Sequence, residues 1–235
     1  MQKRYERNIL LIGEEAQAKL GYARVLVVGA GGLGSPVLYY LAAAGIGHIG
    51  ICDGDTVSVS NLNRQILYKE KNLGNLKVEC AAERLQKLNS LLEFKNYPYF
   101  LDCNNAEKTF LGYDIVVDCL DNLPARYLLN DTCLKLNIPF VHGGISEYYG
   151  QQITVIPHKT PCFRCFCPEG NMGKLPAFGT LGATAGVMGS LMAMEVIKYI
   201  LGKPVNTGSV LYFDGIAMET EKVVIAINPN CKCQK

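Results

Sequence analysis

The sequence predicts an α/β protein with a Rossmann-like, mostly parallel sheet flanked by helices, which continues into an antiparallel C-terminal part with a cysteine zinc site. Three observations support this class. A glycine-rich turn joins an apolar strand to a helix, and polar or glycine residues close four successive apolar strands. From Ser146 onward the pattern changes to strands arranged around one long apolar stretch.

The first unit consists of a strand, a turn, a helix and a second strand. In order, it contains Val25–Val28, the turn GAGGLG at 29–34, Ser35–Ala44 and Ile49–Cys52. The glycines let the backbone approach a phosphate, and the helix N-terminus offers free N–H groups to that anion. Asp53, directly after the second strand, can accept a ribose hydroxyl. A lone GxGxxG often marks only a tight turn, but this context predicts nucleotide binding.

Apolar runs and helical periodicity predict the remaining elements. The expected helices cover 14–20, 75–88, 124–136 and 181–201, and the expected strands cover 94–100, 114–120, 138–144, 148–157, 209–213 and 223–227. Gly29, Asp53, Asp121 and Gly143 close successive parallel strands. Because open α/β sheets bind ligands at the carboxyl ends of their strands, these residues predict one site at that edge.

Composition narrows the class of function. The 235 residues carry a net charge of +2, too small to indicate a nucleic-acid or membrane-surface partner. The N-terminus does not read as a signal peptide. The long apolar stretch contains Glu195 and Lys198 one helical turn apart, so we expect a core or interface helix rather than a membrane span. Ten cysteines without an export signal indicate a reduced, cytoplasmic compartment.

Two close cysteine pairs lie far apart in the sequence. Cys162 and Cys165 form a CxxC, and Cys231 and Cys233 form a CxC. Thiolates at such spacing suit a tetrahedral structural Zn²⁺, which we expect here, with Cys167 as a spare ligand. A redox-active CxxC and a local disulfide are the alternatives.

A series of short sequence blocks points to a known family. The blocks are Arg4-Tyr5-x-Arg7, GAGGLG at 29–34, DGD at 53–55, NLNRQ at 61–65, GxxKVE at 74–79, DCLDN at 118–122, PCFRC at 161–165, MGSLMAMEVIK at 188–198 and NPxC at 228–231. In this order and spacing, over nearly its whole length, the chain resembles the ThiF/MoeB/HesA group of ubiquitin-activating-like adenylyltransferases. Together the blocks are highly specific.

The resemblance implies an activity and its partners. The expected reaction is ATP-dependent adenylation of the C-terminal Gly-Gly carboxylate of a small ubiquitin-like sulfur carrier protein, similar to ThiS or MoaD, with release of pyrophosphate. The product would serve thiamin, molybdopterin or related sulfur transfer. The implied cofactors are ATP, Mg²⁺ and Zn²⁺. A homodimer is also implied, because Arg7 in the family reaches the ATP of the neighbouring subunit.

The resemblance also implies the site residues, position by position. Gly29, Gly31, Gly32 and Gly34 would line the nucleotide, Asp53 would hold the ribose, Asn61, Arg64 and Lys77 would hold phosphates, and Asp121 would bind Mg²⁺. Asp55, Gln65 and Asn122 complete the implied nucleotide-binding set. The implied catalytic set is Arg7, Arg64, Lys77 and Asp121.

Elementary chemistry agrees with this implication. When a carboxylate attacks the α-phosphorus, two anions meet and charge grows on pyrophosphate, so the site needs cations and fixed donors. Scattered cations must supply them, since the sequence has no GxxxxGK[ST] loop. An NAD-dependent oxidoreductase is one alternative, but it gives Arg64, Lys77 and Asp121 no role. A non-catalytic activating-enzyme-like scaffold is the other, and the complete catalytic set disfavours it.

We expect residues 1–235 to form a single adenylation domain with three parts. These are an N-terminal arm over 1–23, a nucleotide-binding part over 24–145, and a carrier-binding and zinc part over 146–235. The arm is expected to be largely solvated.

The segment before the long apolar helix departs from the family pattern. Residues 168–179 are rich in glycine and proline and predict a mobile loop. Many family members carry a cysteine there, whereas 170–185 contains none. We therefore expect no obligatory covalent bond to the carrier, and sulfur from a separate donor. Cys167 is the alternative nucleophile.

Overall fold

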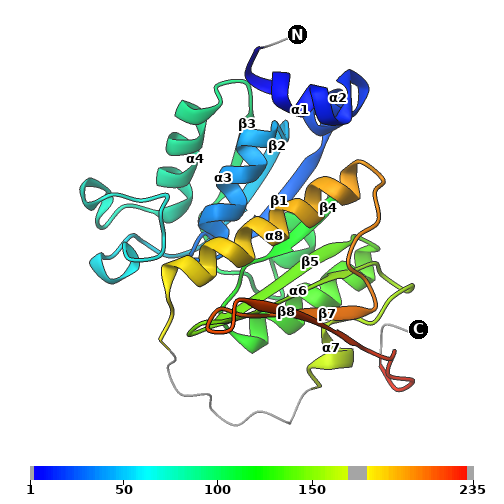
Figure 1. Ribbon diagram of the computed structural model, residues 1–235. Coiled ribbons are helices and arrows are strands. Elements are labelled where there is room, and N and C mark those ends of the chain that lie inside the picture. The colour runs from blue at the N-terminus through cyan, green and yellow to red at the C-terminus, as the bar shows by residue number, and fades with distance from the viewer. Residues whose placement is uncertain (1–2, 169–178, 232–235) are drawn as a thin grey trace.

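The computed structural model describes residues 3–168 and 179–231, and its strands form one eight-stranded sheet (Figure 1). The strands are β1 (Arg24–Val28), β2 (His48–Cys52), β3 (Glu93–Tyr97), β4 (Ile115–Asp118), β5 (Phe140–Ser146), β6 (Tyr149–Val155), β7 (Ser209–Asp214) and β8 (Glu219–Val224). Their spatial order is β3-β2-β1-β4-β5-β6-β7-β8. Strands β1 to β5 are parallel, and β6 to β8 continue the sheet in antiparallel pairing. The predicted fold class is confirmed.

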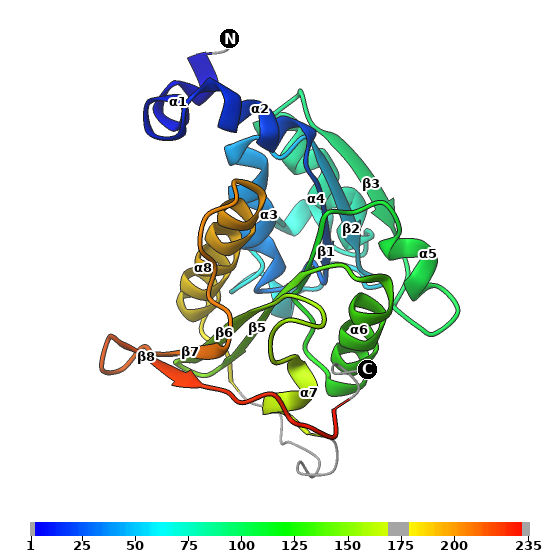
Figure 2. The ribbon, with the colours of Figure 1, turned by 90° about the vertical axis from the view of Figure 1, so that its right-hand side faces the viewer.

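Helices cover both faces of this sheet (Figure 2). They are α1 (Glu6–Ile12), α2 (Glu14–Tyr22), α3 (Gly34–Ala44), α4 (Lys77–Leu88), α5 (Ala106–Phe110), α6 (Leu123–Leu136), α7 (Phe163–Phe166) and α8 (Gly182–Ile200), with short 3-10 turns η1 (Lys3–Tyr5), η2 (Val59–Asn61) and η3 (Glu70–Asn72). Helices α3 and α8 lie side by side on one face, whereas α5 and α6 cover the other.

Strand β1 shows why the sheet is covered on both faces. Every residue of this strand except Arg24 is buried. Val25 and Val27 belong to the core beneath α3 and α8, whereas Leu26 and Val28 belong to the core beneath α6. Side chains alternate across a strand, so a continuous apolar run needs apolar cover on both faces. Burying each such side chain stabilises the fold by roughly 1.5–3 kcal/mol. This burial agrees with the position of β1 as the middle strand of the parallel part of the sheet.

Some predicted boundaries are wrong on the nucleotide side of the fold. Strand β3 ends at Tyr97 rather than at residue 100, because Pro98 has no N–H to donate to the ladder. Helix α4 begins at Lys77 rather than at residue 75. Gly74 has a left-handed φ of 81°, and the Lys77 N–H still donates to the Asp55 carbonyl outside the helix. The turn before α4 therefore extends further than helical periodicity indicates.

The antiparallel part also differs from the prediction. Strand β5 does not end at residue 144, as predicted, but continues to Ser146, because pairing with β6 extends it. Strand β8 covers Glu219–Val224 rather than 223–227. All six of its side chains are exposed, so no apolar run marks its beginning. The hydrogen bonds with β7, rather than an apolar pattern in its own sequence, define an edge strand of this kind.

The N-terminal segment is largely exposed, as expected, but it is helical and tied to the body of the protein. Helix α1 buries none of its residues. However, Asn89 Nδ2 donates to Tyr5 Oη at 2.7 Å, and Arg4 donates to the Leu88 carbonyl. The Tyr5 ring also lies against Gly45. The short helices α1, α5 and α7 are not predicted from the sequence, because each is too short for a helical period to be recognised.

Helix α8 is a core helix, as predicted. Met188 and Met192 are buried against the sheet, and Glu195 Oε2 accepts from Thr154 Oγ1 at 2.9 Å. No helix in the part of the chain that the structure describes is long and apolar enough to cross a membrane. The predicted mobile loop at 168–179 falls almost entirely outside the described residues.

The glycine-rich turn is packed too closely for side chains at two positions. Gly29 has a left-handed φ of 97°, and a Cβ there would lie 2.5 Å from the Cys119 carbonyl oxygen. A Cβ at Gly34 would lie 2.0 Å from the Gly29 carbonyl oxygen. Glycine at these positions lets β1, β4 and the start of α3 meet.

We expect Gly34→Ala to lower the free energy of unfolding by about 2–3 kcal/mol and to weaken nucleotide binding, because the methyl group pushes the turn away from α3. Gly186→Ala in α8 is the matched control, since nothing lies within 4 Å of its Cβ position. That control should stabilise the protein by about 0.5–1 kcal/mol. Urea unfolding and ATP-binding calorimetry measure both effects, and equal stability of the two variants would contradict the close contact.

Candidate active site

A cavity of about 730 Å³ opens at the carboxyl ends of the parallel strands. The segments after β1, β2 and β4, the start of α4, and strands β5 to β7 form its walls. Most of the predicted site residues line it: Gly29, Gly31, Gly32, Asp53, Asp55, Arg64, Gln65, Lys77, Asp121 and Asn122. The predicted meeting of the strand ends is therefore observed.

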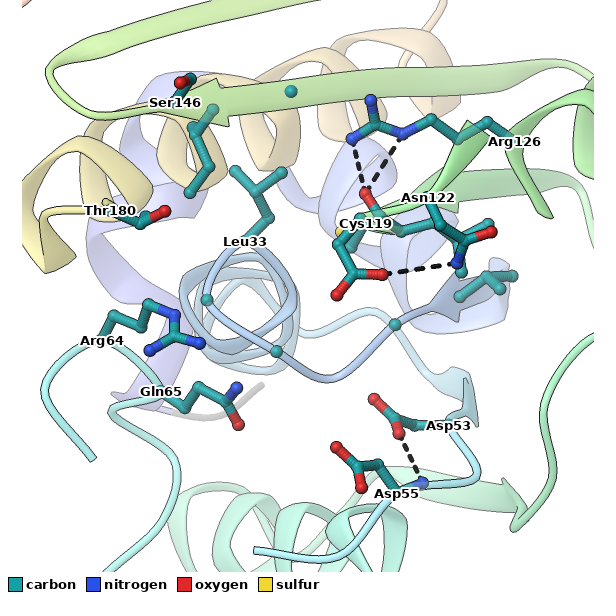
Figure 3. A pocket seen from close by; sticks show the side chains of 18 of the residues that line it. Leu33, Asp53, Asp55, Arg64, Gln65, Cys119, Asn122, Arg126, Ser146 and Thr180 are labelled. Atoms are coloured by element: carbon teal, nitrogen blue, oxygen red, sulfur yellow. Dashed lines mark hydrogen bonds between the residues drawn. The ribbon is translucent and has the colours of Figure 1, made fainter. Parts of the chain in front are cut away.

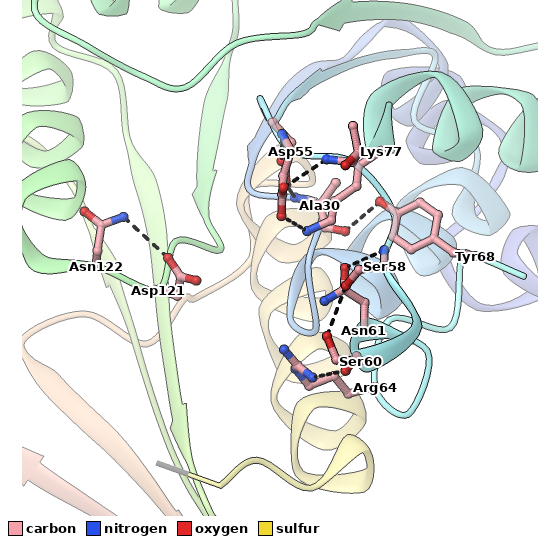
Figure 4. A network of polar contacts seen from close by, with 12 residues as sticks. Ala30, Asp55, Ser58, Ser60, Asn61, Arg64, Tyr68, Lys77, Asp121 and Asn122 are labelled. Atoms are coloured by element: carbon pink, nitrogen blue, oxygen red, sulfur yellow. Dashed lines mark hydrogen bonds and ion pairs between the residues drawn. The ribbon is translucent and has the colours of Figure 1, made fainter. Parts of the chain in front are cut away.

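The segment after β2 holds the glycine-rich turn in place (Figure 4), and Figure 3 shows how Asp53 is tied to Asp55 within that segment. Asp53 Oδ2 accepts from the Ala30 N–H at 2.7 Å, and Asp53 Oδ1 accepts from the Asp55 N–H at 2.9 Å. Tyr68 Oη donates to the Ala30 carbonyl at 2.7 Å. The turn is therefore preorganised. Each Asp53 oxygen keeps a lone pair that a ribose hydroxyl can use.

Lys77 is a buried cation at the edge of the cavity. Its side chain is 5% exposed, and Nζ donates to Asp55 Oδ2 at 2.6 Å (Figure 4). Burial acts to raise the pKa of Asp55, but the hydrogen bond and positive charge of Lys77 lower it below its ordinary value. An ammonium has three donors and this pair uses one, so Lys77 can also bind an anion in the cavity.

The segment after η2 places Arg64 and Gln65 against the glycine-rich turn. Arg64 Nη1 donates to the Ser60 carbonyl at 2.9 Å and to Asn63 Oδ1 at 3.0 Å, which fixes the guanidinium. Gln65 is 4% exposed, and its Oε1 has no hydrogen-bond partner among the described residues. A buried acceptor left unpaired costs about 1–3 kcal/mol. A hydroxyl or amino group of a nucleotide would satisfy it, so these residues fit such a ligand.

Asp121 and Asn122 stand on the opposite wall, where β4 leads into α6. Asn122 caps α6, because its Oδ1 accepts from the Ala125 N–H at 3.0 Å. Its Nδ2 donates to Asp121 Oδ1 at 3.4 Å. Asp121 is exposed to the cavity. Figure 4 shows the pair across the open space from Lys77 and Arg64. An accessible carboxylate facing cations suits Mg²⁺ that also contacts phosphate.

Arg126 lines the same wall and is not predicted from the sequence. Its Nη2 donates to the Leu120 carbonyl at 2.5 Å (Figure 3) and to the Gly143 carbonyl at 3.2 Å, which ties the segment after β4 to the middle of β5. Within the described residues it has no carboxylate partner. Its spacing of one helical turn from the Asn122 cap is the signal that could have located it.

Four predicted residues do not line the cavity. Gly143 lies within β5, and its neighbour Gly144 takes its place in the cavity wall. Gly34 lies beneath the turn. Asn61 shapes the segment that carries Arg64, since its Oδ1 accepts from the Ser58 N–H at 3.2 Å and its carbonyl accepts from the Arg64 N–H at 3.1 Å. Arg7 is exposed on α1, which precedes the amino end of β1, whereas the cavity lies at the carboxyl end (Figure 1). A single chain does not bring Arg7 to the cavity.

Two thiols line the cavity but are poor nucleophiles. Burial, and to a smaller extent the Asp53 carboxylate, raises the pKa of Cys52 to about 12. Burial and the Asp118 carboxylate raise the pKa of Cys119 well above its ordinary value. Both groups are therefore protonated at neutral pH. Chemistry in this cavity therefore depends on its charged side chains and not on nucleophilic attack by these thiols.

A second site joins α7 to the C-terminal segment. Cys162 Sγ lies 3.9 Å from Cys165 Sγ and 3.5 Å from Cys231 Sγ, and the three sulfurs lie within 4.8 Å of one another. A tetrahedral Zn²⁺ with Zn–S bonds of about 2.3 Å needs sulfurs roughly 3.8 Å apart, so these thiols fit such an ion. Cys233, the fourth predicted ligand, lies outside the described residues.

Helix α6 supports this second site. Asn130 Oδ1 accepts from the Phe163 N–H at 3.0 Å, and Arg164 pairs with both oxygens of Asp131 at 2.7 and 2.8 Å. Cys167 is not part of the cysteine cluster, contrary to the prediction of a spare ligand. Instead, its Sγ lies 3.7 Å from the hydroxyl of Tyr127, which donates to the Cys167 carbonyl. The hydroxyl of Tyr127 is therefore the contact that the structure gives this thiol, and the cluster consists of Cys162, Cys165 and Cys231.

The cavity at the carboxyl ends of the parallel strands combines a glycine-rich turn, clustered cations and an accessible carboxylate. These features define a nucleotide-binding α/β protein. The chain belongs to the ThiF family, whose model matches residues 5–235. It is 42% identical to the sulfur carrier protein adenylyltransferase of Thermus thermophilus, over 97% of this chain and 89% of that protein. These matches confirm the predicted family and the predicted enzyme class, an adenylyltransferase.

Two further comparisons agree. The chain is 48% identical to the adenylyltransferase and sulfurtransferase MOCS3 of Culex quinquefasciatus, over 90% of this chain and 50% of that protein, so it spans half the length of this relative. Its fold is similar to that of Escherichia coli MccB in a crystal structure with ATP, with a TM-score of 0.86 and 26% identity. That match covers 99% of this chain and 74% of the MccB chain.

Proposed function

We propose that this protein uses ATP to adenylate the C-terminal Gly-Gly carboxylate of a small ubiquitin-like sulfur carrier protein, with release of pyrophosphate. One observation carries the proposal: a single cavity has Lys77, Arg64 and the glycine-rich turn on one wall and Asp121 on the other. The Thermus relative is named for adenylation of a sulfur carrier protein. The similar MccB structure is a complex with ATP. An NAD-dependent oxidoreductase leaves these charged groups without a role.

Each wall has a distinct task in binding ATP. The turn and the N-terminus of α3 offer backbone N–H groups to phosphate. Asp53 accepts a ribose hydroxyl, and Gln65 Oε1 accepts a donor of the nucleoside. Lys77 and Arg64 neutralise phosphate charge, and Asp121 would hold Mg²⁺, which supplies further neutralisation when bound.

The reaction needs charge stabilisation rather than proton transfer. A carboxylate oxygen of the carrier forms a bond to the α-phosphorus while the bond from that phosphorus to the bridging oxygen breaks. The carboxylate is already ionised at neutral pH, so no base is required. Negative charge grows on pyrophosphate, where Lys77 and Arg64 stabilise it. The protonated Cys52 and Cys119 take no part in this step.

We propose a structural role for the cysteine cluster. Cys162, Cys165 and Cys231, with Cys233, would hold Zn²⁺ and tie the C-terminal segment to α7. A reduced, cytoplasmic compartment is proposed because zinc binding requires free thiolates.

Two proposals concern partners. We propose a homodimer in which Arg7 of one chain reaches ATP in the other. Its support is that Arg7 is exposed and that Leu10 and Leu11 of α1 are 75% and 85% exposed. We also propose that sulfur comes from a separate donor. The carrier then needs no covalent bond to Cys167.

Mass spectrometry of intact carrier proteins tests the proposed function. The protein is incubated with ATP, Mg²⁺ and a panel of ubiquitin-fold sulfur carriers ending in Gly-Gly. One carrier should gain the mass of one AMP moiety, and an equal amount of pyrophosphate should appear. The same carrier without its last glycine should gain nothing. Failure of every carrier to gain AMP, by a protein that binds ATP, would refute the proposal.

A further inference from the structure

Gln151 of β6 lines the cavity opposite Gly144 of β5. A Cβ at Gly144 would lie 3.1 Å from Gln151 Nε2, so the amide lies across this glycine. Gln151 Nε2 also lies 3.4 Å from His142 Nε2. Its Oε1 has no hydrogen-bond partner within the described ranges and is not a buried orphan atom, so it faces accessible space. Gln151 therefore has one end of its amide bound and the other available.

His142 beneath Gln151 is fully buried and paired with Asp118. His142 Nδ1 and Asp118 Oδ2 are 2.7 Å apart, and neither side chain is more than 1% exposed. Burial lowers the pKa of His142 more than the adjacent carboxylate raises it, so the ring is neutral at neutral pH. Phe163 and Phe166 of α7 pack against the ring, with centroids 4.7 and 5.6 Å away. These rings fix the imidazole in place.

This pairing decides the orientation of Gln151. The Asp118 carboxylate can only accept, so His142 Nδ1 carries the proton and Nε2 carries a lone pair. The lone pair needs a donor, and the Gln151 amide nitrogen supplies it. The carbonyl end of that amide is consequently turned away from His142, toward the cavity.

We propose that Gln151 Oε1 accepts a hydrogen bond from the N–H that joins the two final glycines of the carrier tail, with His142 and Asp118 as positioning residues. The inference rests on the proposed function. A Gly-Gly tail has no side chains, so its backbone N–H and C=O groups are the features available for recognition. Gln151 lines the cavity that receives the neighbouring carboxylate, and Gly144 leaves room for the amide.

Gln151→Leu removes the amide and keeps the size of the side chain. In pyrophosphate exchange with the carrier that gains AMP, we expect the KM for carrier to rise about 10-fold and the KM for ATP to change less than about 2-fold. Gln86→Leu is the matched control. Gln86 is exposed on α4, where its Nε2 donates to the Ser90 carbonyl at 2.9 Å, so this variant should change neither KM.

A semisynthetic carrier, with an ester in place of its last peptide bond, removes the N–H from the substrate instead. With the wild-type protein, the KM for the ester carrier should be about 10-fold higher than for the normal carrier. With Gln151→Leu, the ester should raise the KM no further, because both changes remove the same hydrogen bond. Long-range proton–nitrogen NMR should find a proton on His142 Nδ1 and none on Nε2.

The outcomes separate this inference from the function on which it rests. An unchanged carrier KM in Gln151→Leu, or additive losses with the ester carrier, would overturn the role of Gln151 and leave adenylation intact. A proton on His142 Nε2 would overturn the proposed orientation. If no carrier gains AMP, the proposed function and this inference both fail.

Discussion

Lys77→Ala is expected to lower the rate of ATP–pyrophosphate exchange about 100- to 1000-fold without unfolding the protein. Lys77 is the buried cation at the cavity edge. Removing a donor that stabilises charge formed in the transition state costs about 3–4 kcal/mol of barrier. Its partner Asp55 is 53% exposed, so water can replace the lost contact. Exchange of labelled pyrophosphate, measured beside circular dichroism, separates catalysis from folding. Arg64→Ala should show a similar loss.

Lys71→Ala is the matched control for this prediction. Lys71 is exposed on η3 and does not line the cavity, so the variant should exchange pyrophosphate at the wild-type rate. Near-wild-type exchange in both Lys77→Ala and Arg64→Ala would refute the assignment of these residues to phosphate binding.

Cys165→Ser is expected to abolish zinc binding and to lower the free energy of unfolding by about 2–5 kcal/mol, the value of a cross-link across a long loop. Cys162 and Cys231 are 69 residues apart, so a shared ion restricts the unfolded chain. Metal binding by such a cluster is also coupled to folding. Metal analysis and urea unfolding measure both effects. A chelator should destabilise the wild-type protein but not the variant.

Cys103→Ser is the control for the cysteine prediction. Cys103 is an exposed free thiol outside the cluster, so its replacement should change neither zinc content nor stability. Less than half an equivalent of zinc in protein purified without chelator would count against the metal site. A disulfide mapped within Cys162, Cys165 and Cys231 would do the same.

The parallel half of the fold could be predicted because its signals are local. Apart from the exposed Arg24, strands β1 and β4 are buried, and each contains an apolar run; a glycine-rich turn marks the start of α3. The antiparallel edge was harder to predict. Strand β8 exposes all its side chains, and β5 continues through two glycines only because β6 pairs with it. Such elements depend on a neighbour that the local sequence does not reveal.

The charged residues of the site could be predicted, but their partners could not. The family resemblance predicts that Lys77 binds phosphate, and the structure adds the Asp55 carboxylate that fixes it. Arg126 reaches the cavity only because α6 begins at the end of β4.

The contact between Gln151, His142 and Asp118 could not be predicted either. It depends on the register of three neighbouring strands, which pairs Asp118 with His142 and Gly144 with Gln151. A shift of one residue would turn these side chains to the other face of the sheet. Register over such distances is a property of the assembled sheet.

The fate of a labelled oxygen tests the central claim most directly. A carrier whose C-terminal carboxylate is enriched in heavy oxygen is incubated with ATP, Mg²⁺ and the protein, and the adenylate is then cleaved with sulfide. The account predicts AMP that contains one labelled oxygen. A carboxylate oxygen becomes bonded to the α-phosphorus and stays there when sulfide attacks the acyl carbon. Unlabelled AMP, or ADP together with labelled phosphate, would contradict it.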